Sequence, residues 1–338
     1  MATGASQSQI GFVQIEAVYG TIPNSSGTAT VANSDAFRII SLKTKGDTGE
    51  IQRPSKTTNL SRTVGVLGKK NGSWSATVEL AGSGAAGTVP DIDAFLHAAL
   101  GKAGTVVTGV SVTYAPEDAS PSLAIYNFRD PATLEQLVAL GCVVEQMKLN
   151  IGQEQSTIEF SGSCRFVSPS EGFSSLDATA KGGLTAFPTR PSAPTYAGTM
   201  ALGMYGSATL DGSAYTTVRS LAITVDFARS LSDDVLFNGA YPGSPQQSIR
   251  SATVEFELTD DDSAAGESMK AKCRAKTPMD LVFVIGATAG NIWTITLNDV
   301  QVTSPDYEDG QSSWGVKYIG TAHATDESSK DEITIVCT

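Results

Sequence analysis

The chain has 338 residues, a length that accommodates two domains of ordinary size, each with its own core. Its net charge is −12, from 23 basic and 35 acidic residues, which argues against a general nucleic-acid binder, because such proteins need a basic surface. Hydrophobic residues make up 41%, yet the longest apolar run, at positions 281–287, is far shorter than the ~20 residues of a membrane-spanning helix, so we expect a soluble globular protein.

The N-terminal region has no Lys or Arg before Arg38 and therefore lacks the basic segment of a secretory signal, so we expect synthesis in a cytoplasm. Residues 21–58 show no periodic apolar pattern and are expected to form a long loop or arm. From Asp35 to Gly72, eight basic residues stand against three acidic ones. The simplest interpretation is a solvated loop, and the alternative is an arm that docks on an acidic surface of another copy. The residues assigned to that contact are Lys43, Lys45, Arg53 and Lys56.

A strand is predicted from Trp74 to Leu80, where apolar and polar residues alternate, and the preceding Asn71-Gly72 pair predicts a hairpin turn. Residues 82–87 then match the GxGxxG pattern of dinucleotide-binding loops. In such sites a helix starts inside the motif, whereas Pro90 would break a helix already under way. We therefore expect a flexible loop and no cofactor, followed by a helix that begins at Pro90 and stops at Gly101.

The middle of the chain is less regular. The stretch from Asp130 to Leu140 fits either a third helix or an extended segment, and residues 168–200 are rich in Ser, Gly and Pro, as expected of a linker. The cysteine spacing fits no zinc site, so buried, reduced thiols are expected. The cysteines are Cys142, Cys164, Cys273 and Cys337, of which the first two are candidates to face each other across adjacent strands.

The second half repeats features of the first. Ser251–Glu255 has the same five residues as Ser75–Glu79, and both segments place Ala and Val on one face and Thr on the other. A helix is predicted after Ser263, and a turn or bulge at Asn298-Asp299. The repeat indicates a duplicated domain. We therefore predict a mainly β chain of two tandem antiparallel β-sandwich or partial-barrel domains, 1–167 and 201–338, each with a short flanking α-helix, joined by the linker 168–200.

No catalytic or metal-binding group stands out. His97 and His323 are the only histidines, and both lie in amphipathic segments, as structural residues do. The acidic clusters 260–262 and 306–309 lack the spacing of a calcium loop. A hydrolase with a pair of carboxylates is one alternative, although no pair is marked out. We therefore expect that the protein is not an enzyme and that it binds no cofactor and no metal.

The opening segment, Gln9 to Pro23 (QIGFVQIEAVYGTIP), is similar to the "…E…YGT.P" start of tail tube proteins of long-tailed bacteriophages. The segments 72–84 and 92–101 resemble the strand, GSG loop and helix of that family. Segments 140–149 and 158–162 also fit. The resemblance thus covers nearly the whole chain and identifies it as a member of that family.

The resemblance implies a virion structural protein without catalytic activity. Such proteins join edge to edge into rings, which stack into a tube that carries DNA into the host without binding it specifically. The partners implied are further copies of the chain and other tail proteins (tape measure, terminator, and baseplate or tip), with no membrane, in a virion assembled in a bacterial cytoplasm. A duplicated chain would need three copies per ring, and a single tube domain would need six. By strand phase, the candidates to face the lumen are Thr77, Glu79, Thr253, Glu255 and Glu257.

A second function fits the same composition. A β-sandwich adhesin or carbohydrate-binding module on a virion or cell surface would also be β-rich and without catalytic groups. Such a protein would expose aromatic or acidic loops at one end and would remain monomeric. Self-assembly therefore distinguishes the two hypotheses.

Overall fold

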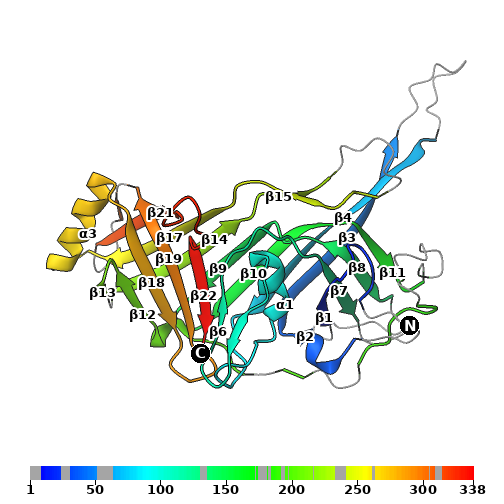
Figure 1. Cartoon of the computed structure of the whole chain (residues 1–338), viewed down its shortest axis with the longest axis horizontal. Helices are drawn as coiled ribbons and strands as arrows, with labels where there is room; N and C mark the ends of the chain where they lie inside the picture. The colour runs from blue at the N-terminus through cyan, green and yellow to red at the C-terminus, as the bar shows by residue number, and fades with distance from the viewer. Residues whose placement is uncertain are drawn as a thin grey trace, which may run out of the picture.

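The structure is a computed structural model that describes residues 9–23, 31–51, 64–129, 135–171, 173, 181, 184–191, 195–196, 198–215, 217–232, 241–260, 263–303, 305–308 and 314–338. It is built mainly of antiparallel strands, with two α-helices in the described parts (Figure 1). Among the described residues, no helix has both the length and the apolar character needed to cross a membrane.

The largest feature is one sheet that runs through both halves of the chain. From one side to the other its strands follow the order β3-β4-β10-β9-β14-β17-β21-β19, and Figure 1 shows β3 and β21 on opposite sides of the molecule. The bounds are β3 Ile39–Ile51, β4 Val66–Glu79, β9 Gln146–Ile151, β10 Ser156–Cys164, β14 Val218–Asp226, β17 Ser251–Thr259, β19 Trp293–Val302 and β21 Gly315–Ala322.

Each half of this sheet is backed by further strands. Behind the first half lies a five-stranded sheet in the order β11-β8-β7-β1-β2. Behind the second half, β19 pairs with β18 and β22, and the hairpin β5–β6 from the first half adds to β22. The bounds are β1 Ile10–Ile15, β2 Ala36–Phe37, β5 Thr105–Val107, β6 Ser111–Tyr114, β7 Leu123–Phe128, β8 Leu137–Cys142, β11 Phe166–Pro169, β12 Ser207–Leu210, β13 Ser213–Tyr215, β18 Met279–Ile285 and β22 Ile333–Cys337, with the short strands β15 Arg229–Leu231, β16 Pro245–Gln247 and β20 Asp306–Glu308.

Both predicted helices are present, although the first begins at Asp93 and not at Pro90. Helix α1 (Asp93–Leu100) ends at Gly101, whose φ of 84° lets its N–H bond to the His97 carbonyl. Helix α3 (Ala264–Ala275) begins after Ser263, whose side chain accepts a hydrogen bond from the Gly266 N–H. The two short 3-10 helices are Asn33–Asp35 and Gly203–Tyr205.

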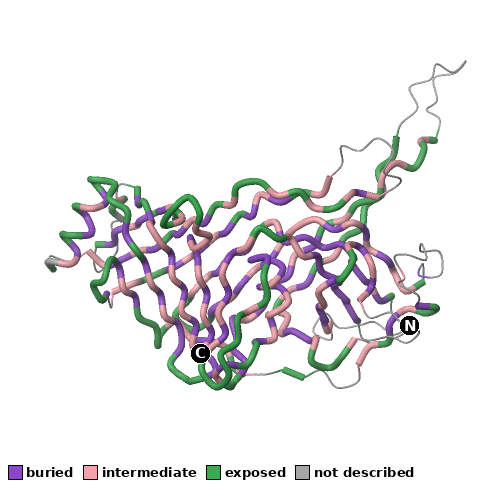
Figure 2. Tube along the Cα trace, in the orientation of Figure 1, coloured by how far each residue is buried: buried purple, intermediate pink, exposed green. Residues whose placement is uncertain are grey.

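The core follows from strand alternation, and buried and half-buried residues alternate along the strands in Figure 2. In the first half, Phe95 of α1 stacks on Phe160 at a ring-centroid distance of 5.0 Å and on Trp74 at 5.8 Å. In the second half, Phe256 stacks on Tyr318 at 5.2 Å. One contiguous apolar cluster contains all five residues, so the two halves share a core.

Two sequence expectations need correction, and one open alternative is decided. Most of the expected loop 21–58 that the structure describes is strand, because Ile39–Ile51 pairs with β4 along its length. The expected turn at Asn71-Gly72 lies inside β4, where Asn71 is opposite Asp47 and Gly72 opposite Gly46. The stretch that fitted a helix or an extended segment is strand β8 where it is described. Propensity failed here because cross-strand pairing over a long hairpin outweighs local turn signals.

Residues 168–200, expected to link the halves, pack in part on the first half. Phe173 and Leu184 are buried in a second apolar cluster with Phe12, Tyr126 and Phe166. That cluster lies on the far side of the β1–β7–β8–β11 sheet, whose other face belongs to the main core. All four cysteines are buried free thiols.

A buried carboxylate joins the opening segment to the first half. Glu16 is 6% exposed and accepts hydrogen bonds from the Gly20 N–H (2.7 Å), the Gly141 N–H (2.8 Å) and the Ser122 hydroxyl (2.6 Å). Gly141 has φ +63°, and a Cβ there would lie 2.9 Å from the Tyr19 ring. Burial raises the pKa of Glu16 to about 7, against the opposing effect of these hydrogen bonds.

This pKa makes the stability of the fold depend on pH. Between about pH 4.5 and 7 the folded chain holds the Glu16 proton more tightly than the unfolded chain, so its contribution to the free energy of unfolding decreases as pH rises, by up to about 3 kcal/mol. In Glu16→Gln that slope should be absent. Urea denaturation at steps across this range measures it, with Glu154→Gln on an exposed turn as the control; equal slopes for all three proteins would contradict the assignment.

Candidate assembly surfaces

The two halves are joined by direct strand pairing between β9 and β14. Leu149 lies opposite Ile223, and Lys148 opposite Thr224. A single row of paired positions therefore crosses the whole sheet. Read from β3 to β19, that row is Ser41, Thr77, Glu159, Lys148, Thr224, Thr253, Thr321 and Gln301.

The side chains of this row share the face of the sheet that points away from the core. Residues opposite each other in adjacent strands point the same way, and residues two apart along a strand do so too. The structure therefore brings all five residues assigned to the lumen onto one surface, although they lie almost 180 positions apart in the sequence. They are Thr77, Glu79, Thr253, Glu255 and Glu257.

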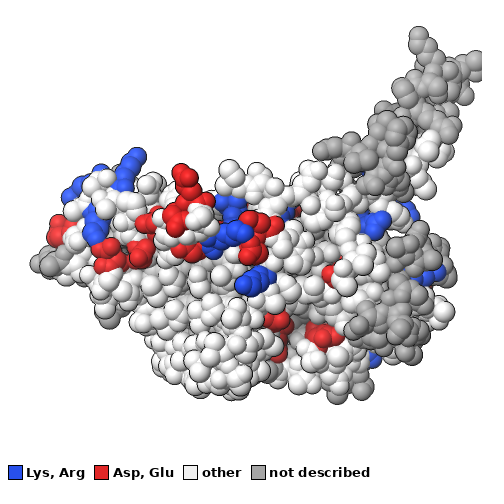
Figure 3. All heavy atoms as spheres, in the orientation of Figure 1, with Lys and Arg blue, Asp and Glu red and all other residues white. Residues whose placement is uncertain are grey.

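The carboxylates on this face lie beside basic groups. Glu255 pairs with Lys317 at 2.6 Å, and Glu257 with Arg219 at 3.0 Å. Glu79 lies 3.6 Å from Arg38. Figure 3 likewise shows acidic and basic side chains interspersed in one band on the visible face. The charge along the paired strands is thus nearly balanced, whereas the chain as a whole is acidic.

Arg229 of the second half is inserted into the first half. It is 4% exposed, and its guanidinium donates to the carbonyls of Ala98 (2.6 Å), Ala119 (3.1 Å) and Val144 (3.4 Å). Burial lowers the pKa of Arg229 to about 10, which leaves the group charged at neutral pH. Three backbone acceptors satisfy this buried cation, which therefore fixes how the halves meet.

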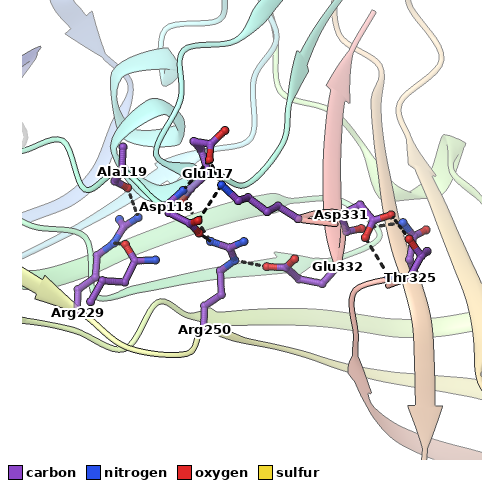
Figure 4. A network of polar contacts seen from close by, with 11 residues as sticks. Glu117, Asp118, Ala119, Arg229, Arg250, Thr325, Asp331 and Glu332 are labelled. Atoms are coloured by element: carbon purple, nitrogen blue, oxygen red, sulfur yellow. Dashed lines mark hydrogen bonds and ion pairs between the residues drawn. The ribbon is translucent and has the colours of Figure 1, made fainter. Parts of the chain in front are cut away.

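An ionic network extends the same contact (Figure 4). Arg250, just before β17, bonds to Glu332, to the Glu117 carbonyl (3.2 Å) and to Asp118 (3.6 Å). Lys330 pairs with the carboxylates of Glu117 and Asp118. The network joins a loop of the first half to two segments of the second.

The hairpin β3–β4 forms an arm that projects from the body of the molecule (Figure 1). Apolar side chains near its outer end face solvent: Ile51 is 62% exposed, Leu67 79% and Val64 87%. An exposed apolar cluster on a projecting element is typical of a protein interface.

The structure places the basic residues assigned to a contact between copies in two groups. Lys43 and Lys45 are exposed residues of β3, opposite Ser75 and Ser73, so they lie in a strand and not in a loop. Arg53 and Lys56 lie outside the described residues.

The GxGxxG segment is packed against other loops. The Gly84 N–H bonds to the Gly290 carbonyl at 3.0 Å, and a Cβ on Gly82 would come within 2.0 Å of that carbonyl oxygen. The glycines are required here for close approach of two backbones. The expected flexible loop is therefore a packing site.

Within the described part of the chain, no group of three or more His, Cys, Asp or Glu residues is arranged to hold a metal. His97 is partly buried in α1, which lowers its pKa despite the nearby carboxylate of Asp93. His323 bonds through its backbone N–H to the Asn298 carbonyl next to β21. Neither histidine has a nucleophile as a hydrogen-bond partner among the bonds of the described residues.

No local sequence pattern indicates the contact between the halves. Arg229 follows an ordinary strand, and its three acceptors are main-chain groups, which carry no residue signature. Arg250 directly precedes the repeated pentapeptide, and a residue pair spanning 82 positions joins it to Glu332. Non-local contacts of this kind are invisible to local patterns.

Replacing Arg229 by Met should weaken the fold by on the order of 3 kcal/mol, because it removes the donor from two buried carbonyls, those of Ala98 and Val144, and from the partly buried carbonyl of Ala119. The matched control is Arg219→Met, which removes an exposed ion pair with Glu257 and should cost less than about 1 kcal/mol. Urea denaturation measures both. Equal losses would show that Arg229 does not hold the halves together.

Comparisons with known proteins complete the description. A family model described as phage tail tube protein matches residues 5–318. No curated protein matches the chain. Among solved structures, the chain is similar to one from the tail of an empty GTA particle in C6 symmetry, with 14% identity over 34% of this chain and 84% of that chain. The TM-score is 0.25, a value that carries no weight for the architecture.

Proposed function

Because the chain belongs to the phage tail tube protein family and is thus a structural protein of a virion tail, we propose that copies of it close into rings that stack into a tube for DNA. The observation that carries this proposal is the continuous sheet. In this sheet β3 pairs only with β4, and residues 301–302 at the end of β19 pair only with β21 among the described residues, whereas the earlier part of β19 continues the sheet into β18. These two edges lie on opposite sides of the chain. Edges of this kind are covered when a neighbour pairs with them.

Three chains per ring fit the order of the strands. The series β3-β4-β10-β9 and the series β14-β17-β21-β19 each place a pentapeptide copy on the second strand and a helix directly or shortly after it. This parallel supports two tandem tube domains, a duplication that makes three chains equivalent to six domains.

The face that carries the Thr77 row is the proposed wall of the channel. Thr and paired charges offer DNA few unpaired cations, and the chain carries a net charge of −12, so binding to phosphate is weak and DNA slides. The lumen residues in this proposal are Thr77, Glu79, Thr253, Glu255 and Glu257.

Stacking of the rings is assigned to the arm. Its exposed apolar side chains need a partner surface, and the basic residues Lys45, Arg53 and Lys56 would face acidic surface on the next ring. At the ends of the tube, the other tail proteins (tape measure, terminator, and baseplate or tip) would take the place of a further ring, in a virion assembled in a bacterial cytoplasm. A monomeric β-sandwich adhesin has no use for two outer strand edges, and no observation favours it.

Purified chain, when concentrated, should form rings and tubes. Since three chains complete a ring, the mass of the smallest closed species should be about three times 35.1 kDa. Light scattering after size exclusion measures the mass, and top-view electron micrographs count the copies. Six chains per ring would contradict the tandem-domain proposal, and persistent monomers would contradict the function itself.

Reversing the charge of the arm should separate stacking from ring closure. In the triple variant Lys45→Glu, Arg53→Glu and Lys56→Glu, rings should form while tubes shorten or disappear, because the arm would then repel an acidic surface. Electron microscopy gives the tube length distribution, and Lys102→Glu, an exposed change after α1, is the control. Tubes of normal length in the triple variant would exclude these residues from the stacking contact.

A further inference from the structure

We propose that β3 of one copy pairs antiparallel with the end of β19 of the next copy, with Ser41 opposite Gln301 and Ile39 opposite Val302. The inference rests on the proposed ring assembly and adds the two strands and their register. The partner is therefore a second copy of this chain.

The template for this contact is the junction inside the chain. There, Lys148 of β9 lies opposite Thr224 of β14. Thr224 is opposite Thr253, and Ser41 is opposite Thr77, the matching residue of the first pentapeptide. Ser41 therefore holds in β3 the place that Thr224 holds in β14.

The other side of the contact follows in the same way. Three successive pairings lead from Ser41 through Thr77 and Glu159 to Lys148. Three equivalent pairings lead from Thr224 through Thr253 and Thr321 to Gln301. A ring that repeats the internal junction thus places Gln301 opposite Ser41 of the next copy. Strand direction agrees, because adjacent strands alternate along the whole path, and β19 and β3 then run antiparallel.

The neighbouring apolar row gives the same junction, with the register shift that already lies between Ile39 and Ser41 where β3 pairs with β4. It begins at Ile39, passes Leu149 opposite Ile223 at the internal junction, and ends at Val302. Val302 is buried and points to the core face. Pairing Ile39 with Val302 continues the apolar layer into the next copy, whereas a shift of one residue would reverse both faces.

Hydrogen-bonding groups at both edges agree with this register. At the internal junction the Phe227 N–H bonds to the Glu145 carbonyl. The backbone N–H and C=O groups of every second residue before it in β14, including Val225, therefore also point toward β9. Leu42 is the counterpart of Val225, and its carbonyl accepts a hydrogen bond from the Gln9 side chain at 3.0 Å, which places this carbonyl on the outer side of β3. On β19, the Thr303 N–H bonds inward to Ile319. The backbone N–H and C=O of Val302 therefore point away from β21, toward the proposed partner strand, while its side chain faces the core.

Charge is complementary beside the apolar row. Lys43 lies two residues after Ser41 in β3, and Asp299 lies two residues before Gln301 in β19, with the Asp280 carboxylate beside it. Because β18 already pairs with β19 at Val300, the proposed contact is between the Lys43 side chain and this pair of carboxylates, and not between directly opposed strand positions. Met279 is already opposite Val300, so the main-chain pairing starts at the Ser41 row. The buried contact that Arg229 makes at the internal junction has no equivalent here. Arg229 lies five positions after Thr224, whereas the residue five positions after Ser41 is Gly46. The contact between copies therefore lacks the buried polar contact that stabilises the junction within a copy.

The register is tested by disulfide trapping between single-cysteine variants of the full chain. Ser41→Cys and Gln301→Cys would form a non-hydrogen-bonded pair, with Cα atoms about 4.5 Å apart, within the range of a disulfide. The four native cysteines are buried and should not interfere. When the two variants are mixed, assembled and oxidised, a covalent dimer should appear on a non-reducing gel, and neither variant alone should give it.

A mixture of Ser41→Cys with Thr303→Cys is the matched control, because it is shifted by two residues on the same face and should give at least fivefold less dimer. Rings that form but yield dimer only in the shifted mixture, or none in either, would overturn the register and leave the ring proposal standing. Failure of the unchanged chain to form any ring would overturn both. If the cysteine variants do not fold, charge reversal tests the same contact. Lys43→Glu should lower the fraction of assembled protein, and Asp299→Lys in the same chain should restore it. No restoration would overturn the register.

Discussion

The arrangement of the whole molecule depends on the register of β9 against β14. Side chains alternate along a strand, so a slip by one residue would move Lys148 to the core and Leu149 to the open face. Along the order of the eight main strands, this pairing is where the described sheet passes from the first half to the second, and the pairing of β6 with β22 joins the halves again behind it. Arg229 beside the β9–β14 junction fixes the arrangement because its three acceptors lie on separate segments. The shared core, the single polar face and the opposite positions of the two edges all follow from it.

The opening segment is held by a different constraint, the need to satisfy a buried carboxylate. Glu16 supplies acceptors to two glycine N–H groups, one of them in the Tyr19-Gly20 turn and the other at Gly141. The spacing of Glu, Tyr and Gly in this part of the sequence is thus explained by packing. It anchors β1 beside β7 and so positions the layer behind the first half of the main sheet.

Local pattern predicted the elements whose two faces differ in polarity. The phase of Ser75–Glu79 and Ser251–Glu255, both helices and the irregularity at Asp299, whose φ is +44°, all agree with the structure. The arm was missed because β3 and β4 are polar on both faces there and contain glycine, so period two is absent. The surfaces for assembly were predictable only in part: strand phase grouped the residues of the open face, whereas the edge at Val302 depends on pairings between distant strands.

Among the described residues, the arm and the hairpin β5–β6 have no counterpart of equal length in the second half. In the proposed tandem arrangement, each half of the chain can take on a separate structural role. One half can keep a long projection while the other keeps a plain sheet, and neither can be lost or duplicated without its companion. In a closed ring of such chains, the inner wall would repeat at every domain, whereas the arm would repeat only at every second domain. Two stacked rings would therefore have fewer equivalent rotational positions relative to each other than the wall alone would allow.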